Sequence, residues 1–476
     1  MVRMYWGALW VTLVCAVGPN ALGQVVTKIA DLGGTLGSEP YTMTLVQGTD
    51  GNLYGTNSDL PGPGGTVFKV TTSGTATLLY QFCSQPNCAD GSLPVSGVML
   101  ATDGNFYGVA DAGGANGYGT VFKITPSGIL TTIYSFCMQY GCADGRSPWG
   151  GLMQASDGKL YGTAQVGGSG GDGTIFRIEP TGLLANIYNF SGFDGAVPFA
   201  ALTEGLDGEL YGTTQRAESQ FLNFWGNVFK TTRKGVLTDL VTFDSDGPDA
   251  YPSAPLVQGP DRIFYGTAWG GNTGTGAIFS ITGEGVFTNL YIFCQQEGCP
   301  DGGSPGPLTL GTDGNWYGTT VNGGNPPCHT YCGTIFRFSA KTKKLTTLYT
   351  FCEESGCPDG DVPYGGLFQA TNGKFYGTTT YGGTKNGGTV FTLDMGLGPF
   401  VAFVRAAGKI GQTGGILGQG LTGTTSVMLN GVPASFNIVS DTYIKATVPQ
   451  GATTGYVTVT TPTGVLTSNV PFHVIP

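Results

Sequence analysis

Histidine and basic residues are scarce in this chain. Its 476 residues include 2 His (His329 and His473) and 21 Lys and Arg, against 31 Asp and Glu, which gives a formal net charge of −10 at pH 7. So few histidines argue against a histidine-ligated zinc centre and against catalysis by a serine–histidine or cysteine–histidine pair. The acidic balance argues against a nucleic-acid partner, because binding to the phosphate backbone needs clustered basic side chains.

Charged side chains of either sign are also few, at 11% of the residues, where a soluble domain typically has about 25%. Glycine is abundant, with 83 residues, and 12% of the chain is aromatic. The hydrophobic fraction of 40% is too high for a disordered chain. This combination is typical of short strands joined by tight turns, and it predicts an all-β fold.

No apolar stretch reaches the roughly 18 residues that a membrane-spanning helix needs, so we expect no transmembrane span. The N-terminus has the pattern of a secretory signal peptide, with a basic start at Arg3, an apolar stretch over residues 4–17 and small residues at 21–23. We expect residues 1–23 to be removed and the protein to be secreted, to the extracellular space or the cell surface. Lipoprotein processing at Cys15 is an alternative, but the residues before it lack the small side chain expected at that cleavage site.

The chain has 11 Cys, and removal of Cys15 with the signal peptide leaves an even number. These form five local pairs: Cys83/Cys88, Cys137/Cys142, Cys294/Cys299, Cys328/Cys332 and Cys352/Cys357. In an exported chain, local pairs of this kind are expected to be disulfides that staple loops. Zinc is the alternative, and it would require two pairs to converge on one metal ion.

A repeat of roughly 50 residues dominates the sequence. Its marker is a Tyr-Gly dipeptide that occurs seven times, at Tyr54, Tyr107, Tyr161, Tyr211, Tyr265, Tyr317 and Tyr376. Four residues before each Tyr is an Asp, or Asn372 in the last repeat. Asp-Gly and Asn-Gly favour two-residue hairpin turns, because both residues tolerate positive φ.

Each repeat is expected to contain four strands, called A to D in chain order. In the second repeat they fall at residues 97–101, 106–110, 120–124 and 130–136. Seven antiparallel repeats of this kind are typical of a β-propeller, so residues 24–397 are expected to form one with seven blades. A β-solenoid is the rival fold, but its repeats are shorter and lack the four-strand rhythm.

The loops vary in length almost entirely on one side. The spacing from Asp or Asn to Tyr is constant, whereas the loops that join B to C and D to the next A vary and carry all five Cys pairs. In an up-and-down blade these two kinds of loop emerge on the same face. We expect that face to be the working face, because function on rigid frames lies in loops.

The last repeat lacks a recognisable fourth strand, because Arg405 stands where the pattern expects Phe. Residues 25–32 are expected to supply that strand and close the ring. The alternative is that residues 400–404 complete the last blade themselves.

Two family resemblances follow from these segments. Residues 427–434, 440–444, 448–455 and 456–460 read as short strands and turns, and the stretch 398–476 resembles the IPT/TIG family of immunoglobulin-like domains, which implies a small β-sandwich. The repeats resemble the GloVer tandem repeat of exported bacterial proteins, on the evidence of residues 103–108, 119–124 and 137–148. That resemblance implies an extracellular location and brings no established activity and no catalytic residues.

Aromatic residues gather on the variable face. The candidate ligand-binding residues are Trp149, Phe199 and Tyr364, which like Tyr41 follow a loop proline, together with Phe224, Trp225 and Trp269. Such a platform can stack on sugar rings or anchor a protein, and packing between blades is the alternative. Asp244, Asp246 and Asp249 form a weak calcium candidate, with a solvated turn as the alternative.

The leading hypothesis is a non-enzymatic binding or scaffold protein whose loop face recognises an extracellular glycan or a surface protein, with no cofactor. The alternative is a polysaccharide-active hydrolase or lyase, although no carboxylate pair can be nominated from the sequence. A purely structural component of the cell envelope is the third possibility.

Overall fold

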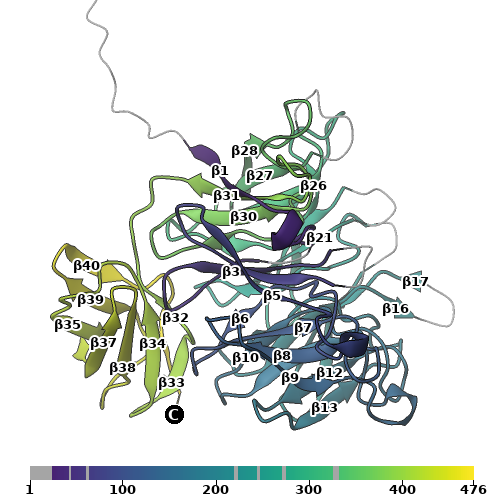
Figure 1. Ribbon diagram of the computed structural model, residues 1–476, viewed down its shortest axis with the longest axis horizontal. Coiled ribbons are helices and arrows are strands. Elements are labelled where there is room, and N and C mark those ends of the chain that lie inside the picture. The colour runs from purple at the N-terminus through teal and green to yellow at the C-terminus, as the bar shows by residue number, and fades with distance from the viewer. Residues whose placement is uncertain are drawn as a thin grey trace, which may run out of the picture.

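The computed structural model in Figure 1 describes residues 24–41, 44–59, 64–218, 223–243, 247–270, 275–324 and 332–475. The structure is all-β. Within these ranges the helices are three short 3-10 turns, η1 (Gly34–Leu36), η2 (Pro86–Cys88) and η3 (Tyr140–Cys142). No helix in the described part of the chain has the length and hydrophobicity needed to cross a membrane.

The seven repeats form seven antiparallel sheets, in which the strands of each repeat lie in sequence order, and the seventh sheet takes its fourth strand from the N-terminus. The first sheet contains β2 (Val46–Gln47), β3 (Leu53–Asn57), β4 (Thr66–Val70) and β5 (Ala76–Gln81). The second contains β6 (Met99–Leu100), β7 (Phe106–Ala110), β8 (Thr120–Ile124) and β9 (Leu130–Ser135). The third contains β10 (Leu152–Gln154), β11 (Leu160–Ala164), β12 (Thr174–Ile178) and β13 (Leu184–Asn189).

The remaining sheets follow the same plan with two elaborations. The fourth contains β14 (Thr203–Glu204), β15 (Leu210–Thr214), β18 (Asn227–Thr231) and β19 (Leu237–Thr242), and its B–C loop carries the hairpin β16 (Ala217–Glu218) and β17 (Asn223–Phe224). The fifth contains β20 (Val257–Gln258), β21 (Phe264–Ala268), β22 (Ala277–Ile281) and β23 (Phe287–Ile292). The sixth has five strands, β24 (Gly303–Pro305), β25 (Thr309–Leu310), β26 (Trp316–Asn322), β27 (Thr334–Ser339) and β28 (Lys344–Thr350).

The N-terminal strand completes the seventh sheet. This sheet contains β29 (Phe368–Gln369), β30 (Phe375–Thr379) and β31 (Thr389–Asp394), and its fourth strand is β1 (Val25–Asp31). The two strands β1 and β31 are antiparallel, and Figure 1 shows them side by side. The expectation that the N-terminus closes the last sheet is confirmed, and the alternative strand at residues 400–404 is ruled out, because β32 (Ala402–Phe403) pairs with the C-terminal sheet instead.

Hydrophobic cores lie between consecutive sheets. One cluster joins the second and third sheets through Phe136 and Phe176, and equivalent clusters follow along the chain. The last cluster joins Phe68 of the first sheet to Tyr376 of the seventh. The packing therefore returns to its start, and the sheets form a closed ring.

The Tyr-Gly marker has a packing cause. Gly108 on β7 pairs across the sheet with Phe122 on β8, and a Cβ at Gly108 would lie 2.5 Å from Cζ of that ring. Only glycine leaves room for the phenylalanine ring to lie over the strand. The same short distance recurs at Gly162, Gly212, Gly266, Gly318 and Gly377.

The C-terminal segment forms two further four-stranded sheets. One contains β32, β34 (Thr413–Leu417), β38 (Tyr443–Thr447) and β37 (Phe436–Ser440), and the other contains β36 (Val432–Pro433), β35 (Ser426–Leu429), β39 (Val457–Thr461) and β40 (Gly464–Thr467). The strands β33 (Ala407–Lys409) and β41 (His473–Ile475) pair in parallel beside them. Their core includes Val401, Ile444 and Val459.

This C-terminal segment packs against the A–B turns of the ring. Thr442 Oγ1 donates a 2.7 Å hydrogen bond to the Thr49 carbonyl, and Tyr443 joins the cluster around Phe106. In Figure 1 these strands lie on the side of the ring opposite to the β16–β17 hairpin. One face of the ring is therefore partly covered, and the variable loops lie on the other.

Candidate ligand-binding face

A strained residue precedes the proline in every D–A loop. These residues have φ between +51° and +59°, the left-handed region that side chains other than glycine rarely adopt, and they are Glu39, Leu93, Ser147, Val197, Tyr251, Ser304 and Val362. Each backbone N–H donates to the B–C loop of the preceding sheet, as Leu93 N–H does to the Gly64 carbonyl at 2.7 Å. Strain of this kind persists only where the surroundings hold it, and it is concentrated at functional sites.

Four of the residues that follow these prolines are aromatic and contact one another on the variable face. Tyr41, Trp149, Phe199 and Tyr364 occupy this position in four loops, and Trp269 reaches the same place from a B–C loop. Five ring contacts close a cycle: Tyr41–Trp149 (6.2 Å between centroids), Trp149–Phe199 (5.2 Å), Phe199–Trp269 (6.3 Å), Trp269–Tyr364 (5.8 Å) and Tyr364–Tyr41 (4.6 Å). We call these five side chains the aromatic rim.

Four of the six candidate residues from the sequence are thus brought together. Trp225 packs edge-on against Tyr251 at 4.2 Å, and no ring contact joins it to the aromatic rim within the described residues. The backbone of Phe224 belongs to β17, and its side chain lies outside the described part of the structure.

A cavity of about 420 Å³ opens beside the aromatic rim. Tyr41, Trp269 and Tyr364 form one wall, and Asn322, Asp361 and Tyr381 contribute the polar part of the lining. A smaller cavity of about 50 Å³ lies under the same rings and is lined by small residues such as Gly150 and Ala201. We call the larger cavity the rim pocket.

Two side-chain oxygens of residues that line the rim pocket stand without a hydrogen-bond partner in the described part of the chain. Within the described structure, Asp361 Oδ1 and Asn322 Oδ1 are buried without a hydrogen bond. Burial raises the pKa of Asp361 to about 6; the Val362 N–H opposes this rise and the charge of Asp359 adds to it. Burial also raises the pKa of the Tyr381 phenol, with further contributions from Glu39 and Asp361.

Asn322, Asp361 and Tyr381 were not among the residues expected from the sequence. A comparison of the repeats carries a signal for one of them, because Asp361 occupies the position of Ser92 and Arg146, two residues before the loop proline. Asp361 and Tyr381 pair backbone to backbone in the seventh repeat, with N–H···O distances of 2.9 and 3.1 Å, and Asn322 joins them from the neighbouring sixth repeat.

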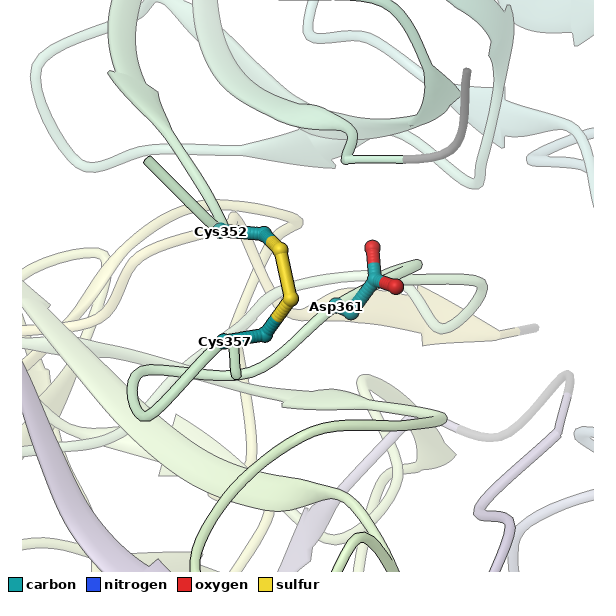
Figure 2. A group of neighbouring side chains, drawn as sticks. All are labelled: Cys352, Cys357 and Asp361. Atoms are coloured by element: carbon teal, nitrogen blue, oxygen red, sulfur yellow. A yellow bond between two sulfur atoms is a disulfide. The ribbon is translucent and has the colours of Figure 1, made fainter. Parts of the chain in front are cut away.

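Four of the five expected disulfides are present, Cys83–Cys88, Cys137–Cys142, Cys294–Cys299 and Cys352–Cys357. Cys328 lies outside the described residues, so its pairing with Cys332 stays a prediction. Figure 2 shows Asp361 next to the Cys352–Cys357 disulfide, with ligand atoms of the three residues within 4.8 Å of one another. Because both sulfur atoms are engaged in the disulfide, they are not thiolate ligands, and this group is not a zinc half-site.

The calcium candidate is described only in part. Asp244 and Asp246 lie outside the described residues, and Asp249 Oδ2 accepts a 3.3 Å hydrogen bond from Asn289 Nδ2. The calcium loop therefore stays a prediction.

The aspartates of the A–B turns have a structural task. Tyr107 Oη donates to Asp103 Oδ2 at 2.8 Å, and the same bond recurs in the other repeats that have Asp at this position. A cleft of about 520 Å³ between the ring and the C-terminal segment includes Asp207 and Asp261, but each of them accepts such a bond from Tyr211 or Tyr265. These hydrogen bonds give the carboxylates a structural role in the A–B turns.

The closed ring of antiparallel sheets, with its functional candidates on loops at one end, defines an all-β tandem-repeat protein. The chain belongs to the Gloeobacter/Verrucomicrobia repeat family, whose profile matches residues 19–143, 138–325 and 219–435. This confirms the tandem-repeat resemblance that the sequence motifs indicate.

Several solved structures are similar to parts of the chain. Oligogalacturonate lyase from Vibrio parahaemolyticus is 12% identical over 78% of this chain and 93% of its own, with a TM-score of 0.44. The extracellular domain of a protein described as a hybrid two-component system of B. thetaiotaomicron is 12% identical over 95% of this chain and 57% of its own, with a TM-score of 0.48. TolB from Acinetobacter baumannii is 13% identical over 71% of this chain and 77% of its own, with a TM-score of 0.36. No curated protein matches the sequence.

Proposed function

We propose that this chain is an exported seven-bladed β-propeller, residues 24–397, followed by an immunoglobulin-like domain of the IPT/TIG type, residues 398–476. The closed packing of the seven repeat sheets supports the propeller, and the two facing C-terminal sheets support the second domain. Export by the signal peptide 1–23 to the extracellular space or the cell surface is supported by the disulfides and by the repeat family.

We further propose that the protein binds a glycan on the face of the variable loops, without catalysis. The aromatic rim and the adjoining rim pocket carry this proposal. Flat aromatic side chains stack on the apolar faces of sugar rings, and the Asp361 side chain in the pocket lining offers a carboxyl that can accept hydrogen bonds from sugar hydroxyls. A protein partner, the other ligand expected from the sequence, would have to place a side chain into the same pocket.

Binding to a glycan array followed by calorimetric titration tests this function. Trp269→Ala and Tyr364→Ala should each weaken binding at least about tenfold, a loss of about 1.4 kcal/mol, because each removes part of the stacking wall. Tyr140→Ala is the matched control, since Tyr140 lies on a loop of the same face, is fully exposed and makes no contact with the aromatic rim. Equal losses for the control, or no glycan bound at all, would contradict the proposal.

The alternative activity is measured in the same samples. A hydrolase or lyase would release new reducing ends from a bound polysaccharide, whereas a binding protein leaves the chain length unchanged. Turnover that is lost in Trp269→Ala and retained in Tyr140→Ala would replace the binding function with an enzymatic one.

A further inference from the structure

The rim pocket has an aromatic corner on one side. The rings of Tyr41 and Tyr364 are stacked, with 26° between their planes, and the Trp269 ring meets Tyr364 at 61°. Two ring faces at an angle offer both a flat apolar surface and negative π density. Such a corner accommodates the face of a sugar ring, and it also attracts a cationic group.

The buried polar atoms of the pocket residues that lack a hydrogen-bond partner in the described structure are all acceptors. Asp361 Oδ1 and Asn322 Oδ1 are both hydrogen-bond acceptors, and Asn322 Nδ2 is already directed to Ser304 Oγ at 3.4 Å. An acceptor left buried without a partner carries a desolvation penalty. A ligand that supplies N–H or O–H donors can satisfy these oxygens once their side chains turn toward the pocket, whereas a ligand that supplies acceptors cannot.

The charge that faces the pocket is negative. Asp361 is the carboxylate in the lining, the acidic side chains Asp359 and Glu39 act on Asp361 and Tyr381, and no lysine or arginine lines the pocket in the described structure. The whole chain carries a net charge of −10. A uronic acid or another anionic sugar would be repelled here. A neutral sugar would gain hydrogen bonds only, whereas an ammonium group would gain a charge-assisted hydrogen bond as well.

We propose that the rim pocket selects a sugar residue with a free, protonated amine, whose ring lies on the Tyr364–Trp269 corner and whose ammonium group binds Asp361 and Asn322. This inference rests on the glycan-binding function proposed above and specifies its ligand. Asp361 sets the preference for the amine, and the aromatic rim supplies binding that is common to all sugars of the same shape.

Three β-1,4-linked oligosaccharides of equal length test the preference, because they differ only at one substituent: oligomers of glucosamine, of N-acetylglucosamine and of glucose. Calorimetric titration at pH 7 should give the glucosamine oligomer an affinity at least about tenfold above the other two. Added sodium chloride should reduce this advantage only modestly, since salt screens a partly buried charge pair less than an exposed one.

Two substitutions test whether Asp361 is the origin of the amine preference. Asp361→Asn should reduce the advantage of the amine to within about threefold, and Asp361→Glu, which keeps the charge, should restore part of it. Asp111→Asn is the matched control, because Asp111 is another carboxyl on a loop of the variable face whose burial raises its pKa to about 6, but it does not line the rim pocket. Thermal unfolding of each variant establishes that the ring is folded.

The outcomes separate this inference from the function on which it rests. Equal binding of all three oligomers with loss in Trp269→Ala would overturn the amine preference and leave glycan binding standing. Tighter binding of an anionic oligosaccharide, or an amine preference that survives in Asp361→Asn, would also overturn it. Failure of every sugar to bind would overturn both.

Discussion

Tyr134 donates a 2.7 Å hydrogen bond to Asp144, and this bond ties β9 to the loop that Cys137 and Cys142 close. The same carboxylate accepts the backbone N–H of Met138 at 2.9 Å. Equivalent tyrosine–aspartate pairs are Tyr80–Asp90, Tyr188–Asp194, Tyr291–Asp301 and Tyr349–Asp359. The fourth sheet has Val241 at the tyrosine position, and the third sheet keeps Tyr188 although the loop that follows has no cysteine pair, so the bond does not depend on the disulfide.

Tyr134→Phe should lower the free energy of unfolding by about 1.5 kcal/mol, because it leaves a carboxylate without one of its donors. Tyr140→Phe should leave it unchanged, since the Tyr140 side chain is fully exposed. Urea unfolding followed by circular dichroism measures both values. Equal stability of the Tyr134 variant and the wild type would show that the bond adds nothing.

Removal of β1 should destabilise the whole ring. A chain that starts at Pro40 lacks the strand that pairs with β31, and it exposes an unpaired edge and part of the core around Phe68. We expect a large fall in the melting temperature and a tendency to aggregate. Val25→Ala, at the exposed start of β1, is the control and should melt like the wild type. An unchanged melting temperature for the truncated chain would contradict closure by this strand.

Gly108→Ala should cost about 1–3 kcal/mol, because the added Cβ would lie 2.5 Å from the Phe122 ring and the ring must move. Gly414→Ala in β34 should be nearly neutral, since a Cβ there meets no atom within 4 Å. Chemical unfolding of both variants gives the comparison. If the cost is steric, adding Phe122→Leu to Gly108→Ala should cost less than the sum of the two single changes.

The pH dependence of stability should differ in sign between two aspartates. Burial raises the pKa of Asp111 from 3.8 to about 6, so the stability that this group contributes is present below pH 3.8 and is lost as the pH rises through 6. Asp111→Asn cannot ionise, and it should therefore raise the melting temperature at pH 7.5 and have little effect at pH 4.

Asp90 provides the opposite case. Burial tends to raise the pKa of Asp90, but hydrogen bonds from Tyr80 and Ser84 outweigh it and lower the pKa below 3.8. Its contribution is present above pH 3.8 and is lost as the pH falls through the folded-state value. Asp90→Asn should therefore lower the melting temperature at pH 7.5, with a smaller effect near pH 3. Melting curves of both variants across this range test the assignment, and shifts of the same sign at pH 7.5 would refute it.

The strands could be predicted closely because their signals are local. The second and third strands of the second repeat fall at Phe106–Ala110 and Thr120–Ile124, as the alternation and the Asp-Gly turn indicate. The first strand is shorter than expected, Met99–Leu100 in place of residues 97–101, because only these two residues pair with β7. The β16–β17 hairpin and the extra strand β24 had no such local signal.

The rim pocket could be predicted only in part. The position after the loop proline is visible in the repeats, and it pointed to Trp149, Phe199 and Tyr364. The stacking of Tyr41 on Tyr364 depends on the first and last loops meeting across the closed ring, which no local pattern encodes. In the sequence, Asp361 and Asn322 cannot be distinguished from ordinary turn residues. Only the described structure shows that each has a buried oxygen without a hydrogen-bond partner.

The pairing of β1 with β31 also means that the ring can close only after both strands have been synthesised. Strand β1 is synthesised well before its partner β31, and until β31 is made the growing chain presents an unpaired edge. A neighbouring copy at high concentration offers an identical strand to that edge, so two chains can complete each other by exchanging their N-terminal segments. Dilution during refolding should favour the self-contained monomer.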